Sequence, residues 1–410
     1  MKRFLVVGPN GGASFGGGGG SFVAIKIAET LSRLPNSQVG LVSLWGARPE
    51  VFEKIFGVSL STSRVKHFSL LTSSTGYELP IGAMTTPYVA AVLMGMTRFL
   101  ERTMERFKPD LVVFNDDSPA LSSIFETRNV RSLLYSHFPY ACRVKYRNKM
   151  LETSSVLRRM SEMLVMPFMA RLFEMDRLWV DWPVANSSVT KKYMRRTFND
   201  REITTIFPPV DAFPYKVPQK SNIIISVGGI QPNKKFEEVI QAMSLVKTDC
   251  KCFIIGNLRD VTYFRSLVRQ VRNLGLERRV HILPEAPRQT LLGLLGRSKL
   301  IIHASRFEPF GISVAEGMNA GAVPIVCASE NGGPWVDIVS KGRYGLGYDG
   351  YESLADRIDS LMDDEAGWQE HSAIARARGA FFSARAFSNS ILKQIGVDEL
   401  PNGGDPLLTE

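Results

Sequence analysis

Two carboxylates separated by seven residues, Glu308 and Glu316, are the side chains of this sequence best placed to do chemistry. The apolar run 300–304 before them is typical of a buried strand, and residues 312–320 fit a helix that follows a turn. Ligands of parallel sheets bind at the carboxyl ends of the strands. We therefore expect Glu308 in a loop and Glu316 near the first turn of the helix, both facing a cleft. Acids also suit a first turn because of the helix dipole, so the spacing alone leaves a structural role open.

A glycine-rich stretch near the N-terminus could hold an anion. Residues 4–7 predict a strand, five consecutive glycines occupy positions 16–20, and residues 22–34 show helical periodicity. Glycines between a strand and a helix let backbone N–H groups approach a phosphate, although a merely flexible loop is the alternative. Neither a Walker A sequence nor a strict G-x-G-x-x-G is present, and the next strand, 38–44, does not end in an acid. These absences disfavour nicotinamide binding.

The same layout recurs in the second half of the chain, now with lysines. A strand predicted over 222–227 runs into Gly228, and a helix predicted over 234–244 begins with Lys234 and Lys235. Lysine beside exposed backbone N–H groups makes a second anion site.

One histidine follows directly after a predicted strand. His137 comes after the apolar residues 133–135, so in a parallel sheet it would face the cleft. A lone histidine is often a hydrogen-bonded structural residue, and that reading is the alternative.

Composition limits the class of protein. A chain of 410 residues predicts two domains, and a content of 44% hydrophobic and 22% charged residues describes a soluble or peripheral protein. The net charge of +10 favours an anionic partner, for which nucleotide-sugar phosphates, a phospholipid surface and nucleic acid all fit. The four cysteines form no C-x2-C pair, which indicates buried thiols and a reducing compartment. The N-terminus lacks a signal-peptide pattern, and prolines make the uncharged stretch 79–97 a poor membrane span.

Strands and helices alternate in both halves of the chain. This order predicts an α/β protein with two Rossmann-like, doubly wound parallel sheets. The four prolines within 206–219 mark a linker. We expect an acceptor-side N-terminal domain at 1–207, a nucleotide-sugar-binding C-terminal domain at 208–385, and a last helix with a tail at 386–410. Residues 51–79 show no regular pattern.

Several short strings resemble one enzyme family. EPFGISVAEGMNAGAVPIV, residues 308–326, resembles the E-x7-E signature of retaining, nucleotide-sugar-dependent glycosyltransferases with the two-domain GT-B fold. Other strings resemble the branch with the dolichol-linked α-1,2-mannosyltransferases and their archaeal relatives: YSHFPY (135–140), NSSVT (186–190), PPVD (208–211) and NGGPWVDIV (331–339). The matches span nearly the whole chain in the family's order.

The resemblance implies a role for each candidate residue. In the family the glutamate at Glu308 contacts the donor sugar, the one at Glu316 holds the ribose diol, and His137 lies beside the reacting sugar face. The catalytic candidates are His137, Glu308 and Lys234. The donor-binding candidates are Gly17, Gly18, Gly19, Gly228, Lys234, Lys235, Arg306, Phe310, Gly311, Ile312 and Glu316. In the family, the turn 310–312 acts through its backbone amides, the glycine loop closes over the pyrophosphate, and the last helix crosses back to the first domain.

One pair of positions departs from the family. The family places an arginine after the second-domain glycine or two residues later, where this chain has Gly229 and Gln231. Lys235 or Arg306 could supply the missing charge. No D-x-D follows a suitable strand, so we expect no metal and no cofactor, with the pyrophosphate neutralised by Lys234 and backbone amides.

These residues together predict a retaining glycosyltransferase that moves a hexose, mannose from GDP-mannose, to a lipid-linked or glycan acceptor. The missing arginine leaves open a non-catalytic sugar-nucleotide-binding or membrane-scaffold partner of another transferase. The basic stretch 143–159, followed by the Met-rich stretch 163–169, suits an anionic membrane surface, and a solvated helix before a core helix explains it equally well. We expect a peripheral protein on the cytoplasmic face of a membrane, and no nucleic-acid partner.

Overall fold

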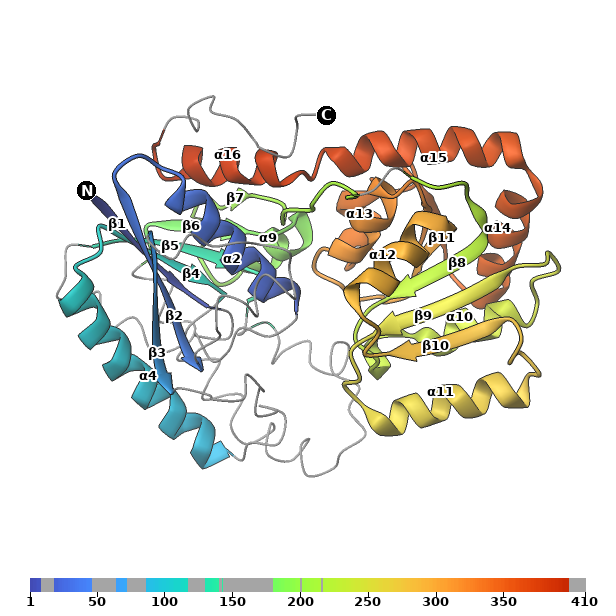
Figure 1. Ribbon diagram of the computed structural model, residues 1–410, viewed down its shortest axis with the longest axis horizontal. Helices are drawn as coiled ribbons and strands as arrows, with labels where there is room; N and C mark the ends of the chain where they lie inside the picture. The colour runs from blue at the N-terminus through green and yellow to red at the C-terminus, as the bar shows by residue number, and fades with distance from the viewer. Residues whose placement is uncertain are drawn as a thin grey trace.

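The chain contains two parallel β-sheets, one in each half of the molecule (Figure 1). The computed structural model describes residues 1–8, 18–45, 64–71, 86–116, 130–139, 142, 180–199, 201–214 and 217–397. The candidate Gly17, and the stretch 143–169 that the sequence assigns to a membrane surface, lie outside these residues.

The N-terminal sheet has seven parallel strands in the order β3-β2-β1-β4-β5-β6-β7. They are β1 (Lys2–Val7), β2 (Ser37–Trp45), β3 (Val65–Leu71), β4 (Leu111–Asn115), β5 (Arg131–Ser136), β6 (Trp182–Ala185) and β7 (Thr204–Thr205). Successive side chains of β1 point to opposite faces. Phe4 and Val6 pack with α2 (Gly19–Ser32), whereas Leu5 and Val7 pack with α4 (Thr86–Phe107). Both faces of the central strands are therefore buried, which is why these strands are continuously apolar.

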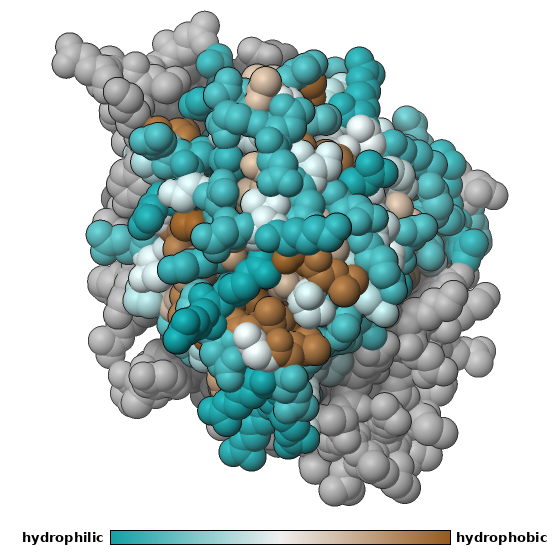
Figure 2. Space-filling view, turned by 90° about the vertical axis from the view of Figure 1, so that its right-hand side faces the viewer, coloured by the Kyte–Doolittle hydropathy of each residue, from teal (hydrophilic) through white to brown (hydrophobic). Residues whose placement is uncertain are grey.

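The C-terminal sheet has six parallel strands in the order β10-β9-β8-β11-β12-β13. They are β8 (Ser221–Val227), β9 (Lys251–Gly256), β10 (Val280–Pro284), β11 (Ser298–His303), β12 (Val323–Cys327) and β13 (Leu346–Tyr348). One face is covered by α10 (Phe236–Met243), α11 (Val261–Asn273) and α14 (Tyr351–Asp363), and the other by α12 (Arg288–Arg297) and α13 (Ile312–Asn319). The outer end of this half is largely hydrophilic, and its most prominent apolar surface lies near the centre of the view (Figure 2).

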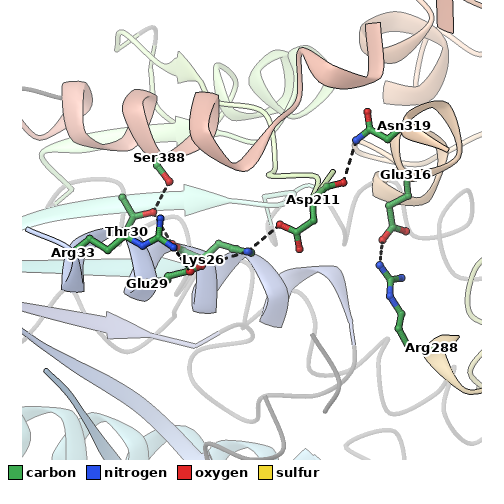
Figure 3. A network of polar contacts seen from close by, with 9 residues as sticks. All are labelled: Lys26, Glu29, Thr30, Arg33, Asp211, Arg288, Glu316, Asn319 and Ser388. Atoms are coloured by element: carbon green, nitrogen blue, oxygen red, sulfur yellow. Dashed lines mark hydrogen bonds and ion pairs between the residues drawn. The ribbon is translucent and has the colours of Figure 1, made fainter. Parts of the chain in front are cut away.

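The two halves are joined by the last two helices and by the linker. After α15 (Glu365–Ala380), α16 (Ala384–Gln394) runs over to the N-terminal half (Figure 1). There Phe387 belongs to the same core cluster as the buried residues of α2. Thr30 of α2 and Ser388 of α16 share a hydrogen bond of 2.8 Å (Figure 3). In the linker, the Asp211 carboxylate lies 2.9 Å from Lys26 Nζ, and its backbone oxygen accepts from Asn319 of α13. The linker thus contacts both halves.

The predicted α/β fold with two Rossmann-like sheets is confirmed. The last strand of the first sheet ends at Thr205 and the first strand of the second begins at Ser221, so the predicted boundary at 207/208 falls between the sheets. All four cysteines are buried free thiols, as expected. No helix among the residues described is long and apolar enough to cross a membrane.

The stretch 51–79, in which the sequence shows no regular pattern, contains β3, whose half-exposed side chains at the sheet edge give a weak apolar signal. Two local predictions were wrong. Helix α2 begins at Gly19 instead of Phe22, so Gly19 and Gly20 form its first turn and are not loop residues. The helix predicted from Lys234 is interrupted, because Lys235 adopts a left-handed conformation (φ 55°) between the 3-10 turn 232–234 and α10.

Candidate functional site

Glu308 lies at the centre of a partly buried charge cluster. It follows β11, whose six residues are all buried, and its carboxylate forms an ion pair with Lys234 Nζ, with side-chain exposures of 18% and 17%. His303 Nε2 lies 3.6 Å from the same oxygen. Burial opposes ionisation of Glu308, but the charge of Lys234 and the contact with His303 outweigh it and hold the pKa of this carboxyl well below its usual range. Glu308 is therefore a permanent hydrogen-bond acceptor at neutral pH.

His303 is a site residue that sequence reasoning missed. It is the last residue of β11, only 5% exposed, and its Nδ1 has no hydrogen-bond partner among the residues described. The signal was available, since His303 ends a buried parallel strand just as His137 follows one.

The loop that carries Glu308 rests directly on the N-G-G-P segment. Gly333 N donates to Glu308 O at 2.7 Å, and a Cβ on Gly333 would lie 2.2 Å from Pro309 O. Gly311 at the end of the loop has φ 97°, and a Cβ there would lie 2.7 Å from Pro334 Cγ. Only glycines allow these two backbone segments to approach so closely.

We expect Gly333→Ala to destabilise the protein by about 1–3 kcal/mol and to weaken donor binding, because the added methyl group must displace the Glu308 loop. Gly332→Ala is the matched control, since its Cβ would lie 3.4 Å from the nearest atom, Ser329 O. Urea unfolding and nucleotide titration of both variants check this. Equal behaviour of the two variants would contradict the close approach.

Glu316 lies at the start of the second turn of α13, directly after the first turn and thus close to its predicted place. Helix α13 starts at Ile312 and has no acid in its first turn. The carboxylate of Glu316 accepts from Arg288 of α12 at 2.7 Å (Figure 3). The positive dipole end at the N-terminus of α13 is thus not neutralised by Glu316.

The side chain of Phe310 points into the core. It is 2% exposed and stacks on Phe207 at 5.7 Å between ring centroids. Within the turn 310–312, a ligand could therefore meet Phe310 only through its backbone.

The N-termini of α2 and α13 meet between the two halves. A Cβ on Gly19 would lie 2.9 Å from Ile312 Cδ1, whereas Gly18 borders open space. Neither helix has a side-chain cap or an acid in its first turn. Two helix N-termini without a side-chain cap from their N-cap residues, each with a positive dipole end, are suited to bind an anion.

His137 is held by two hydrogen bonds, one to its side chain and one to its backbone. Its Nε2 lies 3.2 Å from Asn115 Oδ1, and Asn115 Nδ2 donates to Gly20 O at 2.8 Å. Thr190 Oγ1 donates to His137 O at 3.0 Å. Asn115, fully buried at the end of β4, thus links the histidine to the first turn of α2. Sequence reasoning missed this role, although Asn115 also ends a buried strand.

An aromatic contact joins the loop of His137 to the loop of Glu308. Phe138 packs on Phe307 with 5.1 Å between ring centroids, and Tyr193 packs on both. Tyr193 Oη also donates to Asn331 Oδ1 at 2.9 Å. The residue after His137 therefore touches the residue before Glu308, so both site loops line the same junction.

The remaining predicted cations are separate from this cluster. Arg306 forms an ion pair with Glu238 of α10, and Lys235 Nζ lies 3.7 Å from Glu237. A Cβ on Gly228 would lie 3.3 Å from the stem of Lys234, so the glycine makes room for that lysine. In the described part of the chain, no three His, Cys, Asp or Glu side chains group as a metal site would require.

Comparisons with known proteins agree with this architecture. Residues 209–379 match the family model described as glycosyl transferases group 1. The solved structure of HepE from Anabaena, in complex with UDP, superposes with a TM-score of 0.71 at 17% identity, covering 97% of this chain and 100% of that one. Sucrose-phosphate synthase from Thermosynechococcus elongatus superposes with a TM-score of 0.73 at 16% identity, covering 97% and 98%. Residues 209–379 thus match a glycosyl transferases group 1 domain, and the two-sheet architecture of the chain is the GT-B fold of these structural neighbours.

The named relatives indicate which branch of the glycosyltransferases this chain resembles. The GDP-Man:Man(3)GlcNAc(2)-PP-Dol alpha-1,2-mannosyltransferase of Dictyostelium discoideum is 23% identical over 61% of this chain and 54% of its own length. The Homo sapiens protein of the same name is 28% identical over 39% of this chain and 36% of its own length. The chain thus spans about half or less of the length of these relatives, and it resembles the dolichol-type mannosyltransferases.

Proposed function

We propose that the protein is a retaining, metal-independent mannosyltransferase that moves mannose from GDP-mannose to a lipid-linked glycan. The observation that carries the proposal is the Lys234–Glu308–His303 cluster beside two uncapped helix N-termini, with the loop of His137 packed against the loop of Glu308. Such a site combines an anion cradle with a permanent carboxylate acceptor. The names of the mannosyltransferase relatives support the choice of sugar and nucleotide.

The donor diphosphate would lie at the N-termini of α2 and α13. Unsatisfied N–H groups there and the ammonium of Lys234 balance its charge. Glu308, kept ionised, accepts hydrogen bonds from sugar hydroxyls. Glu316 accepts from the ribose diol when Arg288 either shares the Glu316 carboxylate with the ribose or moves away from it. The side chain of Arg288 is 42% exposed, which permits this movement.

In the proposed reaction the bond between the anomeric carbon and the phosphate oxygen breaks, and the nucleoside diphosphate leaves with the electron pair. The acceptor hydroxyl attacks the same face of the sugar, and its proton passes to the departing phosphate oxygen. The cradle stabilises the negative charge that develops there. His137, oriented by Asn115, positions the sugar at its reacting face.

We infer that the acceptor is presented at the cytoplasmic face of a membrane. The relatives' names specify a dolichol-linked acceptor, and the stretch 143–169 of this chain pairs basic with apolar residues. We expect the protein to co-sediment with vesicles containing anionic lipid at low salt and to dissociate at high salt, because electrostatic attraction is screened. Neutral vesicles are the control. Failure to bind anionic vesicles at low salt would remove the membrane from the proposal.

A nucleotide-sugar panel tests the function itself. Purified protein is incubated with GDP-mannose, UDP-glucose or ADP-glucose and a short-chain lipid-diphosphate glycan, and products are identified by mass and by the anomeric configuration in NMR. Transfer of mannose with an α-linkage from the α-linked donor is the expected result. Binding of a nucleotide sugar without turnover would instead make the protein a sugar-nucleotide-binding partner of another transferase.

A further inference from the structure

Arg259, in the loop between β9 and α11, lies over the glycine turn that follows β8. A Cβ on Gly229 would lie 3.2 Å from Arg259 Cγ and 3.9 Å from Asn257 O. The two loops are hydrogen-bonded to each other, since Ile230 N donates to Asn257 O at 2.8 Å and Asp260 N donates to Ile230 O at 3.0 Å. They follow neighbouring strands of the sheet (Figure 1). The stem of Arg259 is thus held beside the turn that accommodates Lys234.

The other cations around these strand ends already have acidic partners. Lys234 pairs with Glu308, Arg288 with Glu316, and Arg306 with Glu238. Arg259 is exposed, and it forms no ion pair with any carboxylate that the structure describes. Its guanidinium therefore stays available for an anion from solution.

A guanidinium in this place suits a diphosphate. Arginine is always charged and offers a planar fork of N–H donors that matches two phosphate oxygens, whereas lysine offers a point charge. The neighbouring Lys234 shares its charge with Glu308, so the cluster alone carries little net positive charge. A second cation on the same turn would complete the neutralisation.

We propose that Arg259 binds the diphosphate of the nucleotide donor by reaching over Gly229. The assignment rests on the proposed function, since it requires a nucleoside-diphosphate sugar as donor. Gly229 and Arg259 act as one unit, because a side chain at position 229 would occupy the space of the arginine stem. The turn after β8 thus receives its guanidinium from the neighbouring loop.

Binding of GDP, GMP and guanosine to wild type, Arg259→Ala and Arg265→Ala tests the assignment by calorimetry. Arg265 is also exposed, on α11, so its replacement removes the same charge. We expect Arg259→Ala to weaken GDP binding about 10-fold and guanosine binding hardly at all. Its GDP affinity should also fall less steeply with salt, whereas Arg265→Ala should resemble wild type.

A swap of the two side chains gives a second, independent readout. Gly229→Arg alone is expected not to tighten GDP binding, because the new side chain meets the Arg259 stem. In the double variant Gly229→Arg/Arg259→Ala that space is free. We expect its GDP affinity to lie within about 3-fold of wild type, because the new arginine restores the charge-assisted hydrogen bond to the diphosphate. Unchanged thermal midpoints establish that the variants are folded.

Three results would overturn the assignment. Arg259→Ala could match Arg265→Ala in GDP affinity, it could weaken guanosine as much as GDP, or the swap could remain as weak as Arg259→Ala. Each of these leaves the proposed function standing, because wild type still binds GDP. If wild type binds none of GDP, UDP and ADP, the proposed function itself fails and the role of Arg259 with it.

Discussion

Lys234→Met is expected to lower kcat/KM for the donor about 100-fold and to destabilise the protein by about 3 kcal/mol. The variant loses a cation from the proposed diphosphate site. It also leaves Glu308 as a largely buried carboxylate without its lysine partner, with His303 as the remaining contact. Steady-state kinetics and urea unfolding measure the two effects.

The pH dependence and a second substitution separate these two losses. Without Lys234 the pKa of Glu308 rises, because the lysine charge is the strongest influence that lowers it. In acid, Glu308 of the variant is then protonated and its burial cost disappears, so the stability difference from wild type should narrow as the pH falls. Lys234→Met/Glu308→Gln should regain most of the stability but none of the activity. If Lys234→Met alone is as stable and as active as wild type, the anion site lies elsewhere.

His137→Ala is expected to lower kcat about 100-fold with a smaller change in KM, because the proposed role of the imidazole is at the reacting face of the sugar and not at the nucleotide. Single-turnover transfer assays measure the step directly. His67→Gln is the control, since His67 lies on the edge strand β3, where its Nε2 is 3.1 Å from Ser43 Oγ, a contact that glutamine can replace.

Asn115→Leu tests how His137 is positioned. The substitution removes the hydrogen bonds to His137 and to Gly20 O while nearly conserving volume. We expect kcat to fall about 10-fold, with guanosine and GDP affinity nearly unchanged, since one oriented hydrogen bond is lost. If Asn115 had only a structural role, its replacement would lower the thermal midpoint without this selective loss of kcat. If His137→Ala turns over like wild type, the reacting face lies away from this residue.

Fold class and the position of the glutamate pair could be predicted from local patterns. Apolar strands that alternate with periodic helices can bury both faces only in parallel, helix-covered sheets, so the order of elements determined the architecture. The spacing of Glu308 and Glu316 placed Glu308 in the loop after β11 and Glu316 on α13, because the turn 309–311 separates the strand from the helix. The weakly patterned edge strand β3 could not be predicted in the same way, since an edge strand buries fewer side chains.

Contacts between distant residues were decided by the tertiary structure alone. Lys234 and Glu308 are 74 residues apart and meet only because β8 and β11 are neighbours in the sheet. Phe138 and Phe307 meet only because the two halves dock, and Arg259 covers Gly229 only because β9 lies beside β8. Local sequence specifies which elements form, because periodicity and turn residues act over a few positions. The crossover connections of parallel sheets then bring strand ends from distant parts of the chain to one edge, and the charges at that edge define the site.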